Sequence, residues 1–364
     1  MRRLDGSTTV GLAKGASLIL AATLAIAGCT SGLLKPSGTI DLPDQYNSPD
    51  GMVLAADGNI ILSMPNYNDF KSPPKTLKID KDDKISELVT SYPINPDTNQ
   101  PSRPLGVDIG PDGNLYLADC QAINAPKGTK EDSSRLLRVV LKDGKVEKIE
   151  VLVTTFRMAN AVACFGDSVY LTESNLGVSK KGEPAQSGVY RFRYSELSGE
   201  KPIALQPGGT DPHLVVRFAT KNPDWAVGAN GMGFAKDGCM FVCNFGDAQI
   251  LKFTMDKSGK WSPPTVVDEG HGIESTDGMK VHPRTGEIYV ADFLGNAVHK
   301  VDPKTGQVTT LARNRRSLRT DGYLHAPSEV CIRGNKLYVS NIDLSLAGNT
   351  YGKPHSISIY TLPE

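Results

Sequence analysis

The stretch Thr276-Asp-Gly-Met-Lys-Val-His-Pro-Arg-Thr-Gly-Glu-Ile-Tyr-Val-Ala291 combines a polar anchor, a short apolar strand, a glycine-containing turn and a second β-rich strand. The same sequence motif recurs five more times, at residues 48–63, 104–119, 159–172, 229–243 and 327–340. The equivalent anchor positions are 50, 105, 160, 230, 277 and 328, which gives spacings of 55, 55, 70, 47 and 51 residues. Since each spacing fits one four-stranded antiparallel sheet with its turns, the pattern predicts an all-β chain of six similar units.

Further strand pairs between these phrases supply the outer half of each unit, for example residues 76–80 with 85–89, and 297–302 with 308–311. A radial array of such sheets leaves only short, protected edges. Only 36 residues follow position 328, so the sixth unit lacks a strand that Thr39-Ile-Asp-Leu42 can supply. We therefore predict a six-bladed β-propeller over residues 39–364, closed by an N-terminal strand. A linear solenoid is the alternative.

The first 28 residues have the features of a lipoprotein signal peptide. Arg2, Arg3 and Lys14 precede the apolar run 16–27, and Ile26-Ala-Gly-Cys29 forms a lipobox. We expect cleavage before Cys29, lipidation of its thiol, and a tether over residues 29–38. An uncleaved transmembrane helix is the alternative, but the apolar run is shorter than the roughly 20 residues that a span requires.

Composition excludes some partners. The chain is 39% hydrophobic and 22% charged, as in ordinary soluble domains. Removing residues 1–28 leaves 37 basic and 39 acidic residues, a net charge of −2, so no nucleic-acid partner is expected. Five cysteines remain beside Cys29, an odd number, so at least one thiol is free. Cys239 and Cys243 lie in apolar runs, where buried small side chains are expected rather than metal ligands.

Four of the six anchors are Asp50, Asn160, Asn230 and Asp277. The innermost strands of a propeller begin at one face of the central channel, so these side chains should converge there. Burying carboxylates near one another is costly unless a cation offsets their charge. Oxygen ligands of this kind suit Ca²⁺, while Zn²⁺, Mg²⁺ and Mn²⁺ are alternatives. Capping of strands and turns by Asp-Gly and Asn-Gly is the other interpretation.

The phrases around Asn160, Asn230 and Asp277 resemble the inner-strand motifs of the senescence marker protein, gluconolactonase and luciferin-regenerating-enzyme family, which is related to the paraoxonases. The resemblance covers all six blades in pattern, and it is specific at these short motifs. It implies that the anchors hold a divalent metal, which binds the carbonyl oxygen of a lactone or ester. Two positions depart from it. Asp50 stands where gluconolactonase-like members have Glu, and Leu105 where paraoxonases have a proposed proton-shuttle His.

The resemblance favours metal-assisted hydrolysis in which a water attacks with Asp277 as general base. His271 and His325 lie just before the fifth and sixth anchors and are candidates for proton transfer at the channel mouth, or bystanders. Arg103 and Arg157 precede inner strands and could hold a substrate carboxylate, or simply be exposed.

The resulting hypothesis is a metal-dependent lactonase or esterase acting on a small molecule as a monomer. The alternative is a non-catalytic binding or scaffold propeller with a structural channel ion; lyase, isomerase or condensation chemistry is a third class. Thr30 after the lipidated cysteine is not the Asp of inner-membrane retention. We therefore expect anchoring at the outer membrane facing the periplasm or, in a Gram-positive cell, at the outer leaflet of its single membrane.

Overall fold

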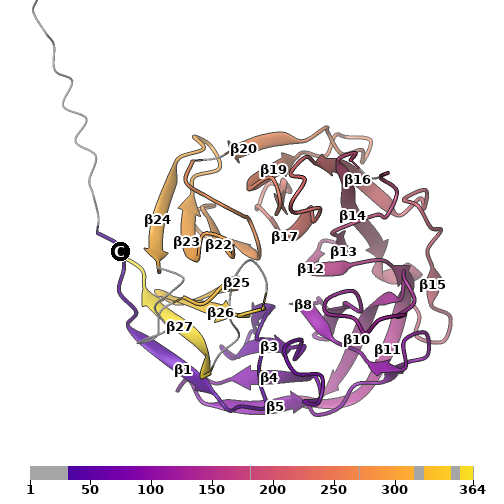
Figure 1. Ribbon diagram of the computed structural model, residues 1–364, viewed down its shortest axis with the longest axis horizontal. Coiled ribbons are helices and arrows are strands. Elements are labelled where there is room, and N and C mark those ends of the chain that lie inside the picture. The colour runs from indigo at the N-terminus through magenta and orange to yellow at the C-terminus, as the bar shows by residue number, and fades with distance from the viewer. Residues whose placement is uncertain (1–31, 181, 270, 315–323, 346–352, 364) are drawn as a thin grey trace, which may run out of the picture. The chain divides into compact units, whose positions relative to one another are not determined.

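Short apolar strands joined by turns form six sheets arranged in a ring, with one innermost strand of each sheet facing the axis of the ring (Figure 1). The computed structural model describes residues 32–180, 182–269, 271–314, 324–345 and 353–363. The predicted signal peptide and Cys29 lie outside these residues. In the described ranges, no helix has the length and apolarity needed to cross a bilayer.

The first three blades, from the channel outward, have the following strands. Blade one contains β2 (Met52–Leu54), β3 (Ile60–Met64), β4 (Lys75–Ile79) and β5 (Ile85–Val89). Blade two contains β8 (Pro104–Ile109), β9 (Leu115–Asp119), β10 (Ser134–Lys142) and β11 (Lys145–Phe156), with β15 (Ile203–Ala204) added in parallel. Blade three contains β12 (Ala159–Phe165), β13 (Ser168–Glu173), β14 (Ala185–Arg193) and β16 (Leu214–Thr220).

The last three blades follow the same plan. Blade four contains β17 (Ala229–Phe234), β18 (Met240–Asn244), β19 (Gln249–Phe253) and β20 (Thr265–Glu269). Blade five contains β21 (Met279–Val281), β22 (Ile288–Asp292), β23 (Ala297–Val301) and β24 (Val308–Arg313). Blade six contains β25 (Pro327–Arg333), β26 (Lys336–Asn341), β27 (His355–Thr361) and β1 (Gly38–Leu42). A small ribbon of β6 (Ile94–Asn95) and β7 (Gln100–Pro101) and the 3₁₀ turn Tyr194–Glu196 complete the assignment.

The N-terminal strand closes the ring, as the sequence predicts. β1 pairs antiparallel with β27, from Gly38 opposite Ile359 to Leu42 opposite His355. Ile40 and Leu42 are buried in one cluster with Met52 of blade one and Ile357 of blade six. The innermost strands of the first and last blades, β2 and β25, are also in contact. These contacts rule out a linear solenoid, whose end units would lie apart.

The part of the expected tether nearest the propeller belongs to the fold. The amide of Leu34 donates to the carbonyl of Leu311 at 2.7 Å, and the amide of Ser37 donates to Ile359 at 2.7 Å. Gly38 already lies in β1. Residues 34–38 therefore belong to the propeller, where they are hydrogen-bonded to blades five and six.

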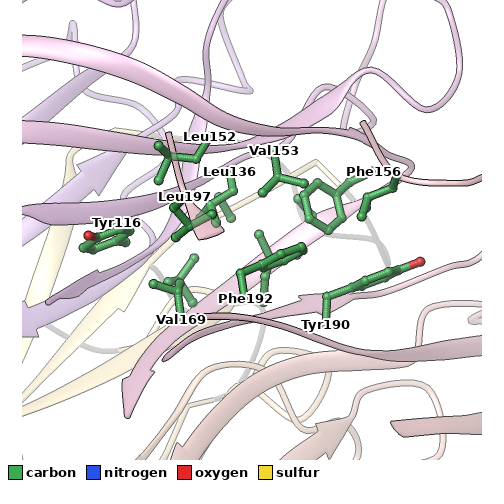
Figure 2. Close-up of a cluster of buried hydrophobic side chains, with 14 of the residues drawn as sticks. Tyr116, Leu136, Leu152, Val153, Phe156, Val169, Tyr190, Phe192 and Leu197 are labelled. Atoms are coloured by element: carbon green, nitrogen blue, oxygen red, sulfur yellow. The ribbon is translucent and has the colours of Figure 1, made fainter. Parts of the chain in front are cut away.

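The core lies between neighbouring blades. The second strands of blades one to five are buried along their whole length, because a blade packs against a neighbour on each face. Figure 2 shows one such layer, in which Tyr116 and Leu136 of blade two lie in the same cluster as Val169 and Phe192 of blade three. Each fully buried side chain of this size contributes roughly 1.5–3 kcal/mol. The five described cysteines form no disulfide.

Glycines that follow the anchors let adjacent inner strands approach closely. A Cβ on Gly51, Gly106, Gly231 or Gly278 would lie 2.4–2.5 Å from the carbonyl oxygen of residue 105, 160, 277 or 328 in the next blade. Three of these glycines donate their amide to the same carbonyl, at 3.2 Å for Gly51, 3.1 Å for Gly231 and 2.7 Å for Gly278. The glycines that follow the anchors of blades one, two, four and five thus set the spacing of these blades around the channel.

Gly106→Ala is expected to destabilise the propeller, because the new methyl group must displace the backbone of Asn160 and Ala161, whose nearest atoms would lie 2.5 and 2.6 Å away. Overpacking of this kind costs about 1–3 kcal/mol. Gly38→Ala is the matched control, since its Cβ would meet only the Ile359 side chain at ordinary distances of 3.7 and 3.9 Å. Thermal unfolding of both variants tests the difference; equal melting temperatures would contradict the close packing.

Candidate functional site

Local irregularities at the start of the inner strands direct the anchor side chains. In blades two, three and four the pairing of the first two strands shifts register around Leu105, Asn160 and Asn230. Such bulges turn a side chain away from the regular alternation of a strand. In blades one and five the anchors precede the strand, where the amide of Asp50 donates to Ser63 at 3.1 Å and that of Asp277 to Ala291 at 2.9 Å.

The anchors meet at one cavity at the end of the channel where the inner strands begin. The cavity contains about 560 Å³ of space, including its open mouth. Its polar lining consists of Asp50, Asn160, Asn230 and Asp277. Its apolar lining consists of Leu105, Ile123, Met158, Trp225, Val227, Phe245, Phe293, Ile342 and Leu344. The predicted set of four anchors is therefore brought together in space.

The amide group of Asn160 has a fixed orientation. Its Nδ2 donates to the hydroxyl of Ser174 at 3.0 Å. That hydroxyl donates its own hydrogen to the carbonyl of Ala229 at 2.6 Å, so it can only accept from Asn160. The Oδ1 of Asn160 is thereby turned away from Ser174 and left as an oxygen donor for a ligand.

The two carboxyl groups are held in a costly arrangement. Burial raises the pKa of Asp50 to about 6, although hydrogen bonds from Ser328 and Gly51 oppose the shift. Burial also raises the pKa of Asp277 well above its ordinary value, and the charges of Asp50 and Glu329 add to that effect. Both carboxylates would be stabilised by a cation between them.

Glu329 is a third channel carboxyl that the sequence analysis missed. Its Oε2 lies 3.2 Å from the Nζ of Lys280. Burial raises its pKa to about 7, while Lys280 opposes the shift. Glu329 follows anchor 328 at the position where four other units have glycine. This departure from the repeat was the feature of the sequence that could have identified Glu329 as a channel residue.

The second strands end in polar residues that hold the loops leading to the anchors, another feature that was missed. Asp119 accepts from the amide of Arg103 at 2.8 Å, and Glu173 accepts from Arg157 and Met158 at 2.8 and 2.7 Å. Asp292 accepts from Ser275 at 2.8 Å. The recurrence of Asp, Glu or Asn at this position, in residues 119, 173, 244, 292 and 341, is visible in the sequence.

The two candidate histidines are not among the residues that line the cavity. His271 follows the outer strand β20, its Nδ1 is hydrogen-bonded to the carboxylate of Asp268, and 70% of its side chain is exposed. The partly buried His325 donates its backbone amide to Oδ1 of Asn341 at 2.9 Å. The structure thus brings neither histidine to the anchors.

The two candidate arginines have intramolecular partners. The guanidinium of Arg103 is buried, donates to the carbonyls of Pro65 and Asn66 at 2.7 and 3.2 Å, and lies 3.8 Å from the centre of the Phe70 ring. Arg157 pairs with Glu131 at 2.6 Å and borders a different pocket. Neither arginine lines the cavity, so their expected role in holding a substrate carboxylate gains no support from their positions.

Comparison with known proteins supports the fold. Neither protein-family profiles nor curated protein sequences match the chain. Among solved structures, a gluconolactonase from Xanthomonas campestris is 15% identical with a TM-score of 0.54, and the match covers 89% of each chain. A luciferin-regenerating enzyme is 13% identical with a TM-score of 0.56, covering 89% of this chain and 96% of that one. An aldose sugar dehydrogenase from Streptomyces coelicolor, solved with PQQ, is 15% identical with a TM-score of 0.57, covering 90% and 97%.

The chain is a six-bladed β-propeller. More particularly, its fold is like that of the senescence marker protein, gluconolactonase and luciferin-regenerating-enzyme structures, which confirms the fold expected from the inner-strand motifs. Because the dehydrogenase matches equally well, this likeness alone does not select a reaction.

In the absence of a bound cation, the protein should be more stable at pH 5 than at pH 8. The folded-state pKa values of Asp50 and Glu329, about 6 and about 7, lie above the ordinary 3.8 and 4.5. The resulting stabilisation is complete below about pH 4 and is lost as the pH rises through 6 to 7, by about 3 kcal/mol per group. Melting temperatures measured against pH in chelator test this. Glu329→Gln should flatten the profile; an unchanged profile would contradict the assignment.

Ser174→Ala should weaken cation binding about 10- to 100-fold, because the amide of Asn160 loses the partner that orients it. Calorimetric titration with Ca²⁺ measures the effect. Ser187→Ala is the matched control from the same blade, since the buried Ser187 hydroxyl has no hydrogen-bond partner among the described residues. Equal affinity in the two variants would remove Ser174 from this role.

Proposed function

We propose that this protein is a metal-dependent hydrolase of lactones or esters. The observation that carries the proposal is the convergence of two carboxylates and two amides at one end of a cavity whose remaining lining is apolar. This arrangement offers a charged site for a reacting carbonyl group next to an apolar site for the rest of a small molecule.

The donor set fits a hard divalent cation, Ca²⁺ first among them. Asp50 and Asp277 would supply charge, and Asn160 and Asn230 would supply neutral oxygens. No cluster of three or more His, Cys, Asp or Glu side chains suited to a metal occurs in the part of the chain that the structure describes. The amide oxygens are therefore an essential part of the proposed site.

A bound cation would supply Lewis-acid polarisation of the substrate carbonyl. Asp277 is the carboxylate that a water molecule can approach, because it is partly exposed to the cavity whereas Asp50 is buried. Asp277 would take the proton from the attacking water and return it to the alkoxide oxygen as the C–O bond of the lactone or ester breaks. The apolar wall would exclude bulk water and strengthen these electrostatic interactions.

A histidine-based mechanism has no support here. Leu105 lines the cavity at the position where paraoxonases have a proposed proton-shuttle histidine, and no histidine of the described residues lines it. Proton transfer is therefore assigned to a carboxylate.

The first 38 residues support a proposal about where in the cell the protein acts. The lipobox at Cys29 supports export and lipid anchoring, and Thr30 favours the outer membrane, with the propeller in the periplasm. We propose that its substrate is met outside the cytoplasm.

Metal analysis of the purified protein, paired with a screen over sugar, aliphatic and aromatic lactones with and without chelator, tests the function. Stoichiometric metal and chelator-sensitive hydrolysis would support the hydrolase. Metal without turnover would favour a binding propeller with a structural ion. Absence of metal would contradict both the metal-dependent hydrolase and the propeller with a structural ion.

Asp277→Asn should abolish turnover, by at least about 100-fold in kcat, while the fold is retained. Asp108→Asn is the control, since Asp108 is a carboxylate of the inner strand β8 that borders a separate pocket at the other ends of the inner strands. Steady-state kinetics and circular dichroism of both variants provide the measurement. Retained activity in Asp277→Asn would remove this residue from its role.

A further inference from the structure

We infer that the cavity selects lactones or esters whose acyl part is an alkyl or aryl group, and that it discriminates against polyhydroxylated sugar lactones. This inference rests on the proposed function and specifies its substrate class. It departs from the activity named for the gluconolactonase of similar fold.

The wall of the cavity is a continuous apolar surface contributed by loops of several blades. Trp225, Phe245 and Phe293 form one side, with ring centres 5.8 Å apart between the first two and 6.1 Å apart between the last two. Phe245 and Phe293 are buried, and both pack in the cluster that contains Leu344. A rigid wall of this kind fits hydrocarbon and offers it no hydrogen bonds.

Three polar side chains close to this wall donate hydrogen bonds to backbone carbonyls of the protein. The hydroxyl of Tyr67 donates to the carbonyl of Cys120 at 2.9 Å. Asn124 donates its Nδ2 to the carbonyl of Tyr67 at 3.1 Å. Nη1 of Arg103 donates to two carbonyls, whereas its buried Nε has no hydrogen-bond partner among the described residues. Among the described residues, the polar lining of the cavity is confined to the four anchors.

The two halves of the cavity orient a substrate. The carbonyl end belongs at Asp277 and the other anchors, and the remainder of the molecule must then lie along the aromatic wall. Sugar hydroxyls buried there would lose water without gaining partners. Each buried methylene would instead raise kcat/KM about fourfold until the cavity is filled.

The experiment compares δ-lactones of one ring size on the metal-loaded, full-length protein. The probes are δ-hexalactone, δ-decalactone and δ-dodecalactone, with glucono-δ-lactone as the sugar lactone. We expect kcat/KM to rise on the order of 100-fold over the four methylenes between the first two probes. Glucono-δ-lactone should be the poorest substrate.

Trp225→Ala should reduce the ratio of kcat/KM for δ-decalactone over δ-hexalactone about tenfold, with little effect on δ-hexalactone. Trp261→Phe is the matched control, because Trp261 is the other tryptophan of the chain and packs in a different cluster of blades three and four. This control also leaves Trp225 as the only tryptophan, so its fluorescence reports ligands in the cavity.

The outcomes are distinct. A preference for glucono-δ-lactone, or no dependence on chain length, would overturn the inference and leave the hydrolase intact. If the metal-loaded protein hydrolyses no lactone, the proposed function fails, and the fluorescence of Trp225 then decides the cavity preference. Titration of Trp261→Phe with 2-pentyltetrahydropyran, a non-hydrolysable analogue, should change that fluorescence, whereas sorbitol should not; the reverse result would overturn the inference.

Discussion

Close packing of six inner strands around one channel is the constraint on which the rest of the structure depends. Gly51, Gly106, Gly231 and Gly278 allow the inner strands of blades one, two, four and five to rest against the anchor carbonyl of the next blade. With a larger residue at these points the ring would have to widen. The same contacts that fix the radius of the ring bring together side chains separated by more than two hundred residues in sequence, so the site is a direct product of blade packing.

That geometry concentrates negative charge. Asp50, Asp277 and Glu329 share the channel, and Lys280 is paired with Glu329 at 3.2 Å. One lysine does not offset three carboxylates, and raised pKa values at all three positions express the imbalance. A bound cation would relieve it, so stability and ligand binding are coupled at the site. The hydrogen bond from Asn160 to Ser174 shows that a residue next to the anchors also orients an anchor side chain.

The sequence predicted the features that repeat and missed those that depend on a single loop or on burial. The repeated inner-strand motifs predicted six blades. The shortage of one strand after position 328 predicted that residues 39–42 complete the sixth blade, as β1 does. Phe245 and Phe293 each follow the polar residue that ends a second strand, so their shared position was visible in the sequence, whereas Trp225 lies in the connection before β17 and has no such repeat. Arg103 was a candidate either for binding a substrate carboxylate or for an exposed position, because a sequence does not reveal a buried guanidinium that is bound to carbonyls. His271 precedes an anchor in sequence, yet its side chain is hydrogen-bonded to Asp268 of the outer strand β20.

Closure by β1 has a consequence for how the protein is made. Ser37 and Ile359, 322 residues apart, lie together at the seam of the ring. Contacts of such long range form late, because chain entropy must be lost before they are gained. During synthesis the N-terminal strand is made first, and its partner β27 is made last. The seam can form only when the described strands are all present, so the unfinished chain presents an open strand edge that is prone to pairing with other chains.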